Sequence, residues 1–400
     1  MAQGVLLGLQ RILEEQQPAR VVLPQLYKKH RQWGSRDRKT VGEMLFDLLR
    51  WKDRYAYSAS TNPDNPYYYW HLIGVWSVLK NGELPPWEEV QNLRAETILA
   101  LFEKSKAVPT LCHSFPEWMT KLGSQTYGEQ EWQLEMEALN QTPTLTIRIN
   151  SLKTTLEKLQ QALLEDHNIV THQIENYPDA LVVAKTQKLE PLALFKEGHF
   201  EIQDANSQKV TAFCEVLPGQ KVLDACCGAG GKSLHLATLM KNQGQLLASD
   251  IRAHKLDQLV MRANRNGIKN IQVAAADALP ESWLNNTDVV LIDAPCSGSG
   301  VIRRSPETKW LLNPKKVTQL SQLQANLLQE KAQFVKPNGS LVYATCSLLK
   351  EENQDQIKSF LASSNGQAFA LEKECLLMVH QTRFDGFYMA RLRKKAVSSQ

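Results

Sequence analysis

The sequence predicts an α/β protein in which a doubly wound, mostly parallel sheet follows a small α+β unit and an all-helical region. From Gly198 onward, short apolar runs that suit buried strands alternate with stretches of helical periodicity. The first run leads through a glycine-rich loop into a helix, in KVLDACCGAGGKSLHLATLM. Such alternation predicts a parallel sheet covered by helices on both faces. Residues 1–125, in contrast, show only helical spacing.

Residues 1–125 are therefore predicted to form a small helical domain. Apolar residues recur at helical spacing in Val5–Leu13 and again in Val41–Leu49. The stretch Lys28–Lys39 holds six basic residues against one Asp, so it is either a solvated surface or a phosphate-contacting patch. The region contains no paired acids and no nucleophile with a base, which favours a binding or docking module.

Residues 126–197 are predicted to form a connector helix and a small β-α-β-β unit. Leu145–Ile149 alternates like a strand, Leu156–Leu164 has helical spacing, and Ile169–Val183 contains two short β-type runs. A sheet this small suits a subdomain beside a larger one. The larger domain is expected at residues 198–400, with strands in KVLDA, QLLASD, IQVAAAD, VVLID and SLVYATC.

The composition indicates an ordinary globular protein of a reducing compartment. The 400 residues are 43% apolar and carry a net charge of +4. Seven cysteines show no CxxC pair and no framework spacing, so we expect free thiols. The sequence shows neither a basic leader nor an apolar run of membrane-spanning length. We expect a cytoplasmic monomer with no metal ion and no membrane partner.

The glycine-rich loop Cys226–Lys232 (CCGAGGK) misses two common nucleotide-binding patterns by one residue each. A phosphate-binding loop would need glycine at position 226, which is Cys226, and the dinucleotide pattern that starts at Gly228 would need glycine at Ser233. S-adenosylmethionine has no phosphate, and a glycine turn would let the backbone approach its methionine and ribose parts. The loop is therefore interpreted as a site for this cofactor.

Three acids at predicted strand ends follow the loop: Asp250, Asp277 and Asp293. Asp250 stands where a carboxylate would accept hydrogen bonds from both ribose hydroxyls. Asp277 is placed to accept one from the adenine amino group. A single acid at a strand end is as often a helix cap. Three in succession after a glycine loop favour a methyltransferase site.

Two thiols, Cys296 in DAPCSGSG and Cys346 in ATCS, follow separate apolar strands. Either alone could be a small buried hydrophobe. Together they suit pyrimidine methylation, because carbon 5 becomes nucleophilic once a thiolate has added to carbon 6. Asp293 is placed to hydrogen-bond or protonate ring nitrogen 3, and expulsion of the first thiol gives the second a function. Their positions in the sequence do not show which of the two thiols is the nucleophile and which assists release.

Eight motifs occur in the order TLTIRIN, GHFEIQDANSQ, DACCGAGGKS, ASD, AAAD, DAPCSGSGVIRRSPETKW, ATCS and FDGFYMARL. With them the chain resembles the RNA cytosine-5 methyltransferases of the RsmB/Nop/Sun family from about His113 to Lys394. The resemblance implies that Cys346 is the nucleophile and that Cys296 assists product release. It also implies that the acids and the glycine loop lie at or near the cofactor. The loop residues are Cys226, Cys227, Gly228, Ala229, Gly230, Gly231 and Lys232, of which Lys232 would reach the cofactor carboxylate or the target base.

One departure from the family is the loop itself, which commonly reads CAAPGGK. Here Ala229 replaces the proline and Cys227 is an extra thiol. We expect a more flexible loop with a modest effect on cofactor affinity, and a buried Cys227 without a role.

The segment WGSRDRKTVGEMLFDLLRW resembles the NusB-type RNA-binding domain of the bacterial ribosomal RNA members, mainly over residues 36–51. It favours ribosomal RNA of the small subunit as the substrate, with Arg303 and Arg304 as candidate phosphate contacts or surface charges. The alternatives are a transfer RNA cytosine-5 methyltransferase, a non-catalytic ribosome-assembly factor that binds RNA, and a small-molecule methyltransferase.

Overall fold

The computed structural model describes residues 1–396. Two compact units emerge: unit 1 comprises Met1–Thr142 with Val301–Pro314, and unit 2 comprises Pro143–Gly300 with Lys315–Gln400. The connector helix expected at the start of residues 126–197 thus belongs to unit 1, and the small sheet shares unit 2 with the large one. The division into three domains stays a prediction.

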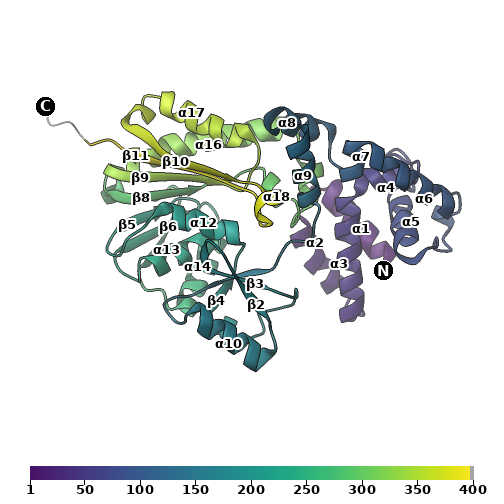
Figure 1. Ribbon diagram of the computed structural model, residues 1–400, viewed down its shortest axis with the longest axis horizontal. Helices are drawn as coiled ribbons and strands as arrows, with labels where there is room; N and C mark the ends of the chain where they lie inside the picture. Colours follow the sequence, from purple (N-terminus) through teal and green to yellow (C-terminus); the bar gives the residue numbers. More distant parts are fainter. Residues whose placement is uncertain (397–400) are drawn as a thin grey trace. The chain divides into compact units, whose positions relative to one another are not determined.

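Unit 1 consists of helices, as its periodicity predicts (Figure 1). The α-helices are α1 (Ala2–Leu13), α2 (Ala19–Lys29), α3 (Ser35–Arg50), α4 (Lys52–Ser58), α5 (Tyr68–Asn81), α6 (Ala95–Lys104), α7 (Pro109–His113), α8 (Glu117–Tyr127), α9 (Glu129–Leu139) and α15 (Thr308–Leu311). Two 3-10 turns, η1 (Glu88–Val90) and η2 (Ser105–Ala107), lie between them. The apolar positions at helical spacing, such as Leu9, Leu45 and Leu48, are fully buried and form one core.

Unit 2 is built on a seven-stranded sheet in the order β10-β11-β9-β8-β5-β6-β7. Its strands are β5 (Lys221–Asp224), β6 (Gln245–Asp250), β7 (Ile271–Ala275), β8 (Thr287–Asp293), β9 (Val335–Thr345), β10 (Phe369–Leu377) and β11 (Phe387–Lys394). The five strands from β5 to β9 pair in parallel, and β11 pairs antiparallel with both β9 and β10. The predicted doubly wound sheet is confirmed.

Helices cover both faces of this sheet, in separate layers (Figure 1). One layer is α12 (Ala205–Cys214), α13 (Gly231–Leu239) and α14 (Ala253–Asn266), and the other includes α16 (Pro314–Lys331) and α17 (Gln354–Ala362). Alternate residues of each strand face opposite layers, as Val222 and Leu223 do in β5. In the sheet, β5 lies between β6, to which the chain connects next, and β8. This switch point is where open α/β sheets bind ligands.

The small sheet is antiparallel, in the order β2-β3-β1-β4. Its elements are β1 (Thr146–Ile149), α10 (Leu156–His167), β2 (Thr171–Ile174), β3 (Tyr177–Val183), α11 (Ala193–Lys196) and β4 (Phe200–Ile202). The remaining short elements are η3 (Glu281–Trp283), η4 (Ser299–Val301), η5 (Ala332–Phe334), η6 (Lys350–Glu352), η7 (Gly366–Ala368) and α18 (Val379–Thr382). Within residues 1–396, every helix is too short or too polar to cross a membrane.

The segment Val301–Pro314 is part of the helical unit although it follows β8 in the chain. Lys309 is fully buried there, and its Nζ donates to the carbonyl oxygens of Arg50 (2.6 Å) and Ser114 (2.8 Å) and to Oδ1 of Asn140 (3.1 Å). The indole of Trp310 donates to the carbonyl oxygen of Leu49 (2.6 Å). Much of the motif RRSPETKW therefore stabilises unit 1.

Replacing Lys309 with methionine should destabilise unit 1 by at least about 2 kcal/mol, because three buried acceptors lose their donor while the side-chain volume is kept. Urea unfolding of the full chain, followed by circular dichroism at the helical band, measures this loss. Lys315→Met, at an exposed position, is the control and should stay within about 0.5 kcal/mol of the parent. Equal midpoints for Lys309→Met and the parent would contradict the structural role.

Candidate active site at the carboxyl edge of the large sheet

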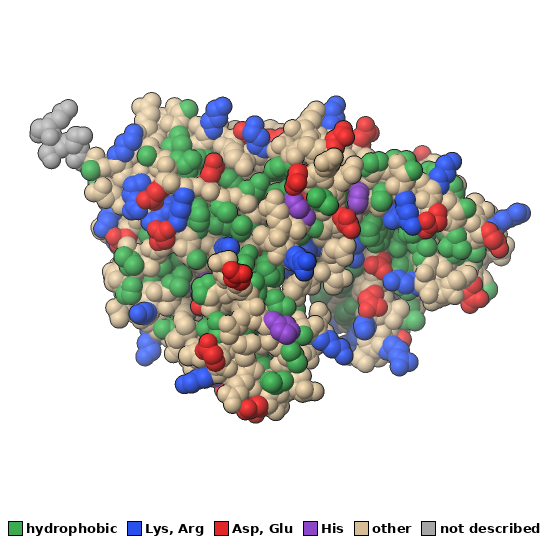
Figure 2. Space-filling view, in the orientation of Figure 1, with side chains coloured by type: hydrophobic (Ala, Val, Ile, Leu, Met, Phe, Trp, Pro, Cys, Tyr) green, Lys and Arg blue, Asp and Glu red, His purple; other side chains and the backbone are tan. Residues whose placement is uncertain are grey.

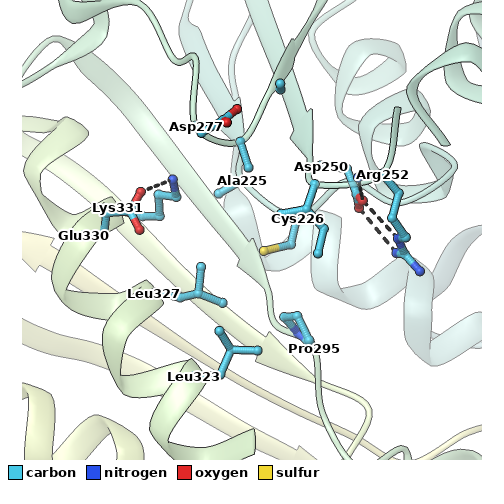
Figure 3. A pocket seen from close by; sticks show the side chains of 13 residues that line it. Ala225, Cys226, Asp250, Arg252, Asp277, Pro295, Leu323, Leu327, Glu330 and Lys331 are labelled. Atoms are coloured by element: carbon cyan, nitrogen blue, oxygen red, sulfur yellow. Dashed lines mark hydrogen bonds and ion pairs between the residues drawn. The ribbon is translucent and has the colours of Figure 1, made fainter. Parts of the chain in front are cut away.

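A pocket of about 620 Å³ lies at the carboxyl ends of β5, β6 and β7 (Figure 3). Its lining is Ala225, Cys226, Asp250, Ile251, Arg252, Ala275, Ala276, Asp277, Pro295, Leu323, Leu327, Glu330 and Lys331. Of the expected cofactor contacts, Cys226, Asp250 and Asp277 belong to this lining. The others, Cys227, Gly228, Ala229, Gly230, Gly231, Lys232 and Asp293, lie outside it.

The glycine loop joins the end of β5 to the start of α13 in a conformation that needs glycine. Gly230 has φ of 84°, and a Cβ there would lie 2.0 Å from Cδ1 of Leu259. Arg262 donates from Nη1 to the carbonyl oxygen of Ala229 (2.6 Å). This contact restrains the loop at the position where the family has proline. Cys227 is buried, and burial raises the pKa of its thiol, which fits a residue without a chemical role.

Asp250 ties the glycine loop to the pocket. Its Oδ2 accepts from the backbone N–H of Gly228 (2.9 Å), and its Oδ1 accepts from the backbone N–H of Arg252 (2.9 Å). Burial acts to raise the pKa of this carboxyl, but the hydrogen bonds from Arg252 and Gly228 outweigh it and hold the pKa below its usual value. An ionised acceptor therefore faces the pocket, as binding of ribose hydroxyls requires.

Lys232 and Asp293 form an ion pair at the same edge, with Nζ 2.7 Å from Oδ2. Burial acts to lower the pKa of Lys232, yet the charge of Asp293 raises it overall, so the ammonium group stays protonated. Beneath this pair, Asp224 is fully buried and accepts a hydrogen bond from Ser233 (2.6 Å). Burial raises the pKa of Asp224 to about 7.

The two thiols meet beside this pair, with 3.2 Å between the sulfurs of Cys296 and Cys346. Cys296 lies three residues past β8 and Cys346 directly follows β9, its parallel neighbour. The Gly300 N–H donates to the carbonyl oxygen of Cys346 (2.9 Å), which joins the two loops again. Pro295, next to Cys296, lines the pocket, so the thiol loop contributes to the pocket wall.

The surroundings of Cys296 favour the protonated form of its thiol. The hydrogen bond to Cys346, burial and the nearby Glu352 carboxylate raise the pKa of Cys296 well above its ordinary value. At neutral pH Cys296 therefore holds its proton, and its S–H can donate to the sulfur of Cys346.

Several features of the site were absent from the sequence prediction. One wall of the pocket comes from α16, where Leu323 and Leu327 face Asp250 across the cavity and Lys331 pairs with Glu330 at 2.5 Å (Figure 3). Helical spacing shows that α16 has an apolar face, but spacing alone does not say which cavity that face borders. The prediction that Arg303 is a phosphate contact or a surface charge is wrong, because its side chain is only 3% exposed.

The residues present fit S-adenosylmethionine. An ionised acid at the end of β6, an apolar wall from α16 and Cys226, the first residue of the glycine-rich loop, line one pocket at the switch point of the sheet. Within residues 1–396, His, Cys, Asp and Glu nowhere gather in a group of three or more that could hold a metal ion. Fold and site define a Rossmann-like, S-adenosylmethionine-dependent methyltransferase.

Comparison with known proteins identifies the family. The family described as 16S rRNA methyltransferase RsmB/F matches residues 213–393, and its ferredoxin-like domain matches residues 115–190. Ribosomal RNA small subunit methyltransferase B of Klebsiella pneumoniae is 30% identical over 425 residues, covering 97% of this chain and 96% of the relative. The chain belongs to the RsmB/F family of rRNA methyltransferases, as the motifs predicted.

Other relatives and solved structures agree. The probable ribosomal RNA small subunit methyltransferase B of Synechocystis is 34% identical over 300 residues, which are 70% of this chain and 67% of that protein. The crystal structure of PH0851 has a TM-score of 0.80 at 25% identity, covering 98% of this chain and 99% of its own. NSun6 from Pyrococcus horikoshii, solved with SFG, shares the fold with a TM-score of 0.63 at 19% identity, covering 70% and 99%.

Asp250→Asn should weaken the binding of S-adenosylmethionine about ten- to a hundredfold, because a hydrogen bond to a charged acceptor contributes about 1.5–3 kcal/mol. Isothermal titration calorimetry measures the dissociation constant directly. Asp257→Asn, on the exposed side of α14, is the matched control and should bind like the parent. An affinity of Asp250→Asn within twofold of the parent would remove Asp250 from the cofactor site.

Asp224 should make stability depend on pH. Its folded pKa of about 7 exceeds the unfolded value near 4, so the stabilisation is complete below about pH 4 and is lost as the pH rises through 7. Asp224→Asn lacks this titration. From pH 5 to pH 8, the free energy of unfolding of the parent, measured with urea, should therefore fall by roughly 2 kcal/mol relative to that of Asp224→Asn. A difference that does not vary with pH would contradict the raised pKa.

Proposed function

We propose that this protein forms 5-methylcytosine in ribosomal RNA of the small subunit, with S-adenosylmethionine as methyl donor. The observation that carries the proposal is the 3.2 Å contact between the sulfurs of Cys296 and Cys346, beside the cofactor pocket. Methylation of an exocyclic nitrogen or a hydroxyl oxygen needs no thiol, because those atoms carry their own lone pairs. Methylation at carbon 5 of a pyrimidine requires one.

Cys346 is proposed as the nucleophile. Its thiolate adds to carbon 6 of the cytosine and forms the S–C6 bond, and the electron pair of the ring double bond becomes available at carbon 5. When bound, S-adenosylmethionine supplies an electrophilic methyl group on its sulfonium. Asp293, which lies at the same sheet edge, would accept a hydrogen bond from ring nitrogen 3 while that nitrogen carries a solvent-derived proton in the adduct, and Lys232 holds the carboxylate in place.

Cys296 is proposed to act in release. After methylation the carbon 5 proton leaves to solvent, the ring double bond re-forms and the Cys346–C6 bond breaks, which returns Cys346 as a thiolate. A sulfur that holds its proton and lies within 3.2 Å can stabilise this departing thiolate by donating its S–H. The raised pKa of Cys296 supports this assignment.

Ribosomal RNA is proposed as the substrate because the relatives that align over nearly the whole chain are small-subunit ribosomal RNA methyltransferases. All six basic side chains of Lys28–Lys39 are exposed in unit 1, where they can contact phosphates. On the face that Figure 2 shows, basic and acidic side chains are otherwise interspersed. We further propose a cytoplasmic monomer that binds a flipped or single-stranded base.

Cys346→Ala should abolish methyl transfer, whereas Cys296→Ala should accumulate an RNA-protein adduct that survives denaturing gels. The measurement uses small-subunit ribosomal RNA, both free and in assembling particles, with cofactor labelled in the methyl group. Cys375→Ala, in β10, which lies two strands from β9 in the sheet, is the control and should methylate like the parent.

The reverse pattern, with the adduct in Cys346→Ala, would exchange the roles of the two thiols. Absence of label from every RNA and every particle would refute the enzymatic proposal and leave a binding factor. Nuclease digestion and mass analysis of labelled RNA should find the label in 5-methylcytosine.

A further inference from the structure

Glu352, the last residue of η6, is a fully buried carboxylate beneath the two thiol loops. It contacts neither the pocket lining nor the sulfurs through any hydrogen bond among the described residues. Two of its three side-chain hydrogen bonds go instead to the loops that carry the thiols, and the third goes to Gln324 in α16. In each of them a side-chain oxygen of Glu352 is the acceptor.

One oxygen of Glu352 holds the loop of Cys296. Oε1 accepts from the backbone N–H of Ser297 (2.8 Å), the residue after the thiol. The same oxygen accepts from Nε2 of Gln324 in α16 (2.9 Å). That amide also donates to the carbonyl oxygen of Pro295 (2.9 Å), so both residues that flank Cys296 are fixed.

The other oxygen holds the loop of Cys346. Oε2 accepts from the hydroxyl of Ser347 (2.5 Å), the residue after this thiol. The Ser347 hydroxyl lies 3.1 Å from the hydroxyls of both Ser297 and Ser299, and it accepts from the backbone N–H of Leu349 (3.0 Å). These groups are all buried, so water does not compete for the hydrogen bonds.

We infer that Glu352 is a positioning residue: its carboxylate joins the loop of Cys296 to the loop of Cys346 and so keeps the two sulfurs in contact. The inference deepens the proposed function, because the reaction uses this contact when Cys346 leaves the methylated base. A thiol held even 1 Å too far away would donate a much weaker hydrogen bond to the departing thiolate.

The reach of Glu352 and its charge can be tested separately. Glu352→Gln keeps the length: its Oε1 can accept from Ser297 and Gln324, and its amide can donate to the Ser347 hydroxyl, which can then turn toward Ser297 or Ser299. Glu352→Asp keeps the charge but draws the carboxylate back by one methylene, so it cannot reach both loops. A positioning role predicts that the aspartate variant is the more damaged. A role of the charge alone predicts the opposite order.

The separation of the sulfurs can be measured without RNA or cofactor. Diamide oxidises two adjacent thiols to a disulfide and is itself reduced to the hydrazine, and peptide mass spectrometry quantifies the Cys296–Cys346 link. We expect rapid linking in the parent, a rate at least tenfold lower in Glu352→Asp, and less than a threefold change in Glu352→Gln. In the methylation assay kcat should fall in the same order, while the KM for S-adenosylmethionine stays within twofold.

Glu374 in β10 provides a control carboxylate, because it is exposed and its Oε2 accepts from the hydroxyl of Tyr388 (2.7 Å) and not from a thiol loop. Glu374→Gln and Glu374→Asp should leave linking and kcat unchanged. If Glu352→Asp does not fold, Ser347→Ala removes the hydrogen bond from the Cys346 loop to Glu352, together with the contacts of that hydroxyl with Ser297, Ser299 and Leu349, and should also slow linking about tenfold.

Several outcomes would overturn the inference: slow linking in the parent, parent-like linking in Glu352→Asp or in Ser347→Ala, or greater damage in Glu352→Gln than in Glu352→Asp. Failure of the proposed function is distinguishable, because the linking experiment contains no substrate. A parent protein that forms the Cys296–Cys346 disulfide rapidly but transfers no methyl group would refute the cytosine-5 proposal without contradicting the positioning role of Glu352.

Discussion

The parallel pairing of β8 with β9 is the constraint on which the rest of the site depends. In this register Asp293 lies opposite Ala344, and the Ala294 N–H donates to the carbonyl oxygen of Ala344 (2.8 Å). Both chains therefore leave the sheet at one level and on one edge, and two thiols 50 residues apart in sequence come within 3.2 Å. An antiparallel pair would have placed the two strand ends at opposite edges.

The same edge explains why cofactor and nucleophile are neighbours. The chain reverses its winding direction at β5, which opens a crevice between the helix layers, and Asp250, which accepts a hydrogen bond from Gly228 of the glycine loop, borders that crevice. Loss of proline in the loop is accompanied by a hydrogen bond from Arg262 to Ala229. The restraint that a proline ring gives this loop in the family can thus come here from the side chain of Arg262 on α14.

The most specific motif of the sequence, DAPCSGSGVIRRSPETKW, turns out to serve two structural purposes. Its first part carries Asp293 and Cys296 at the sheet edge. Its second part belongs to unit 1, where Lys309 donates to three buried oxygens. Strong similarity over such a motif therefore reflects chemistry and folding together, and Arg303 inside it is a buried basic residue.

The sequence by itself determined the alternation of strands and helices, the all-helical start, the glycine loop and the placement of acids and thiols at strand ends. These follow from periodicity and from turn residues, which are local properties of the chain. Only the tertiary structure decided that α16 walls the pocket, that Cys296 lies where its surroundings raise the pKa of its thiol, and that Glu352 spans both loops. Burial and contacts across space set these properties, and residues far apart in the chain, such as Gln324, Pro295 and Glu352, supply them together.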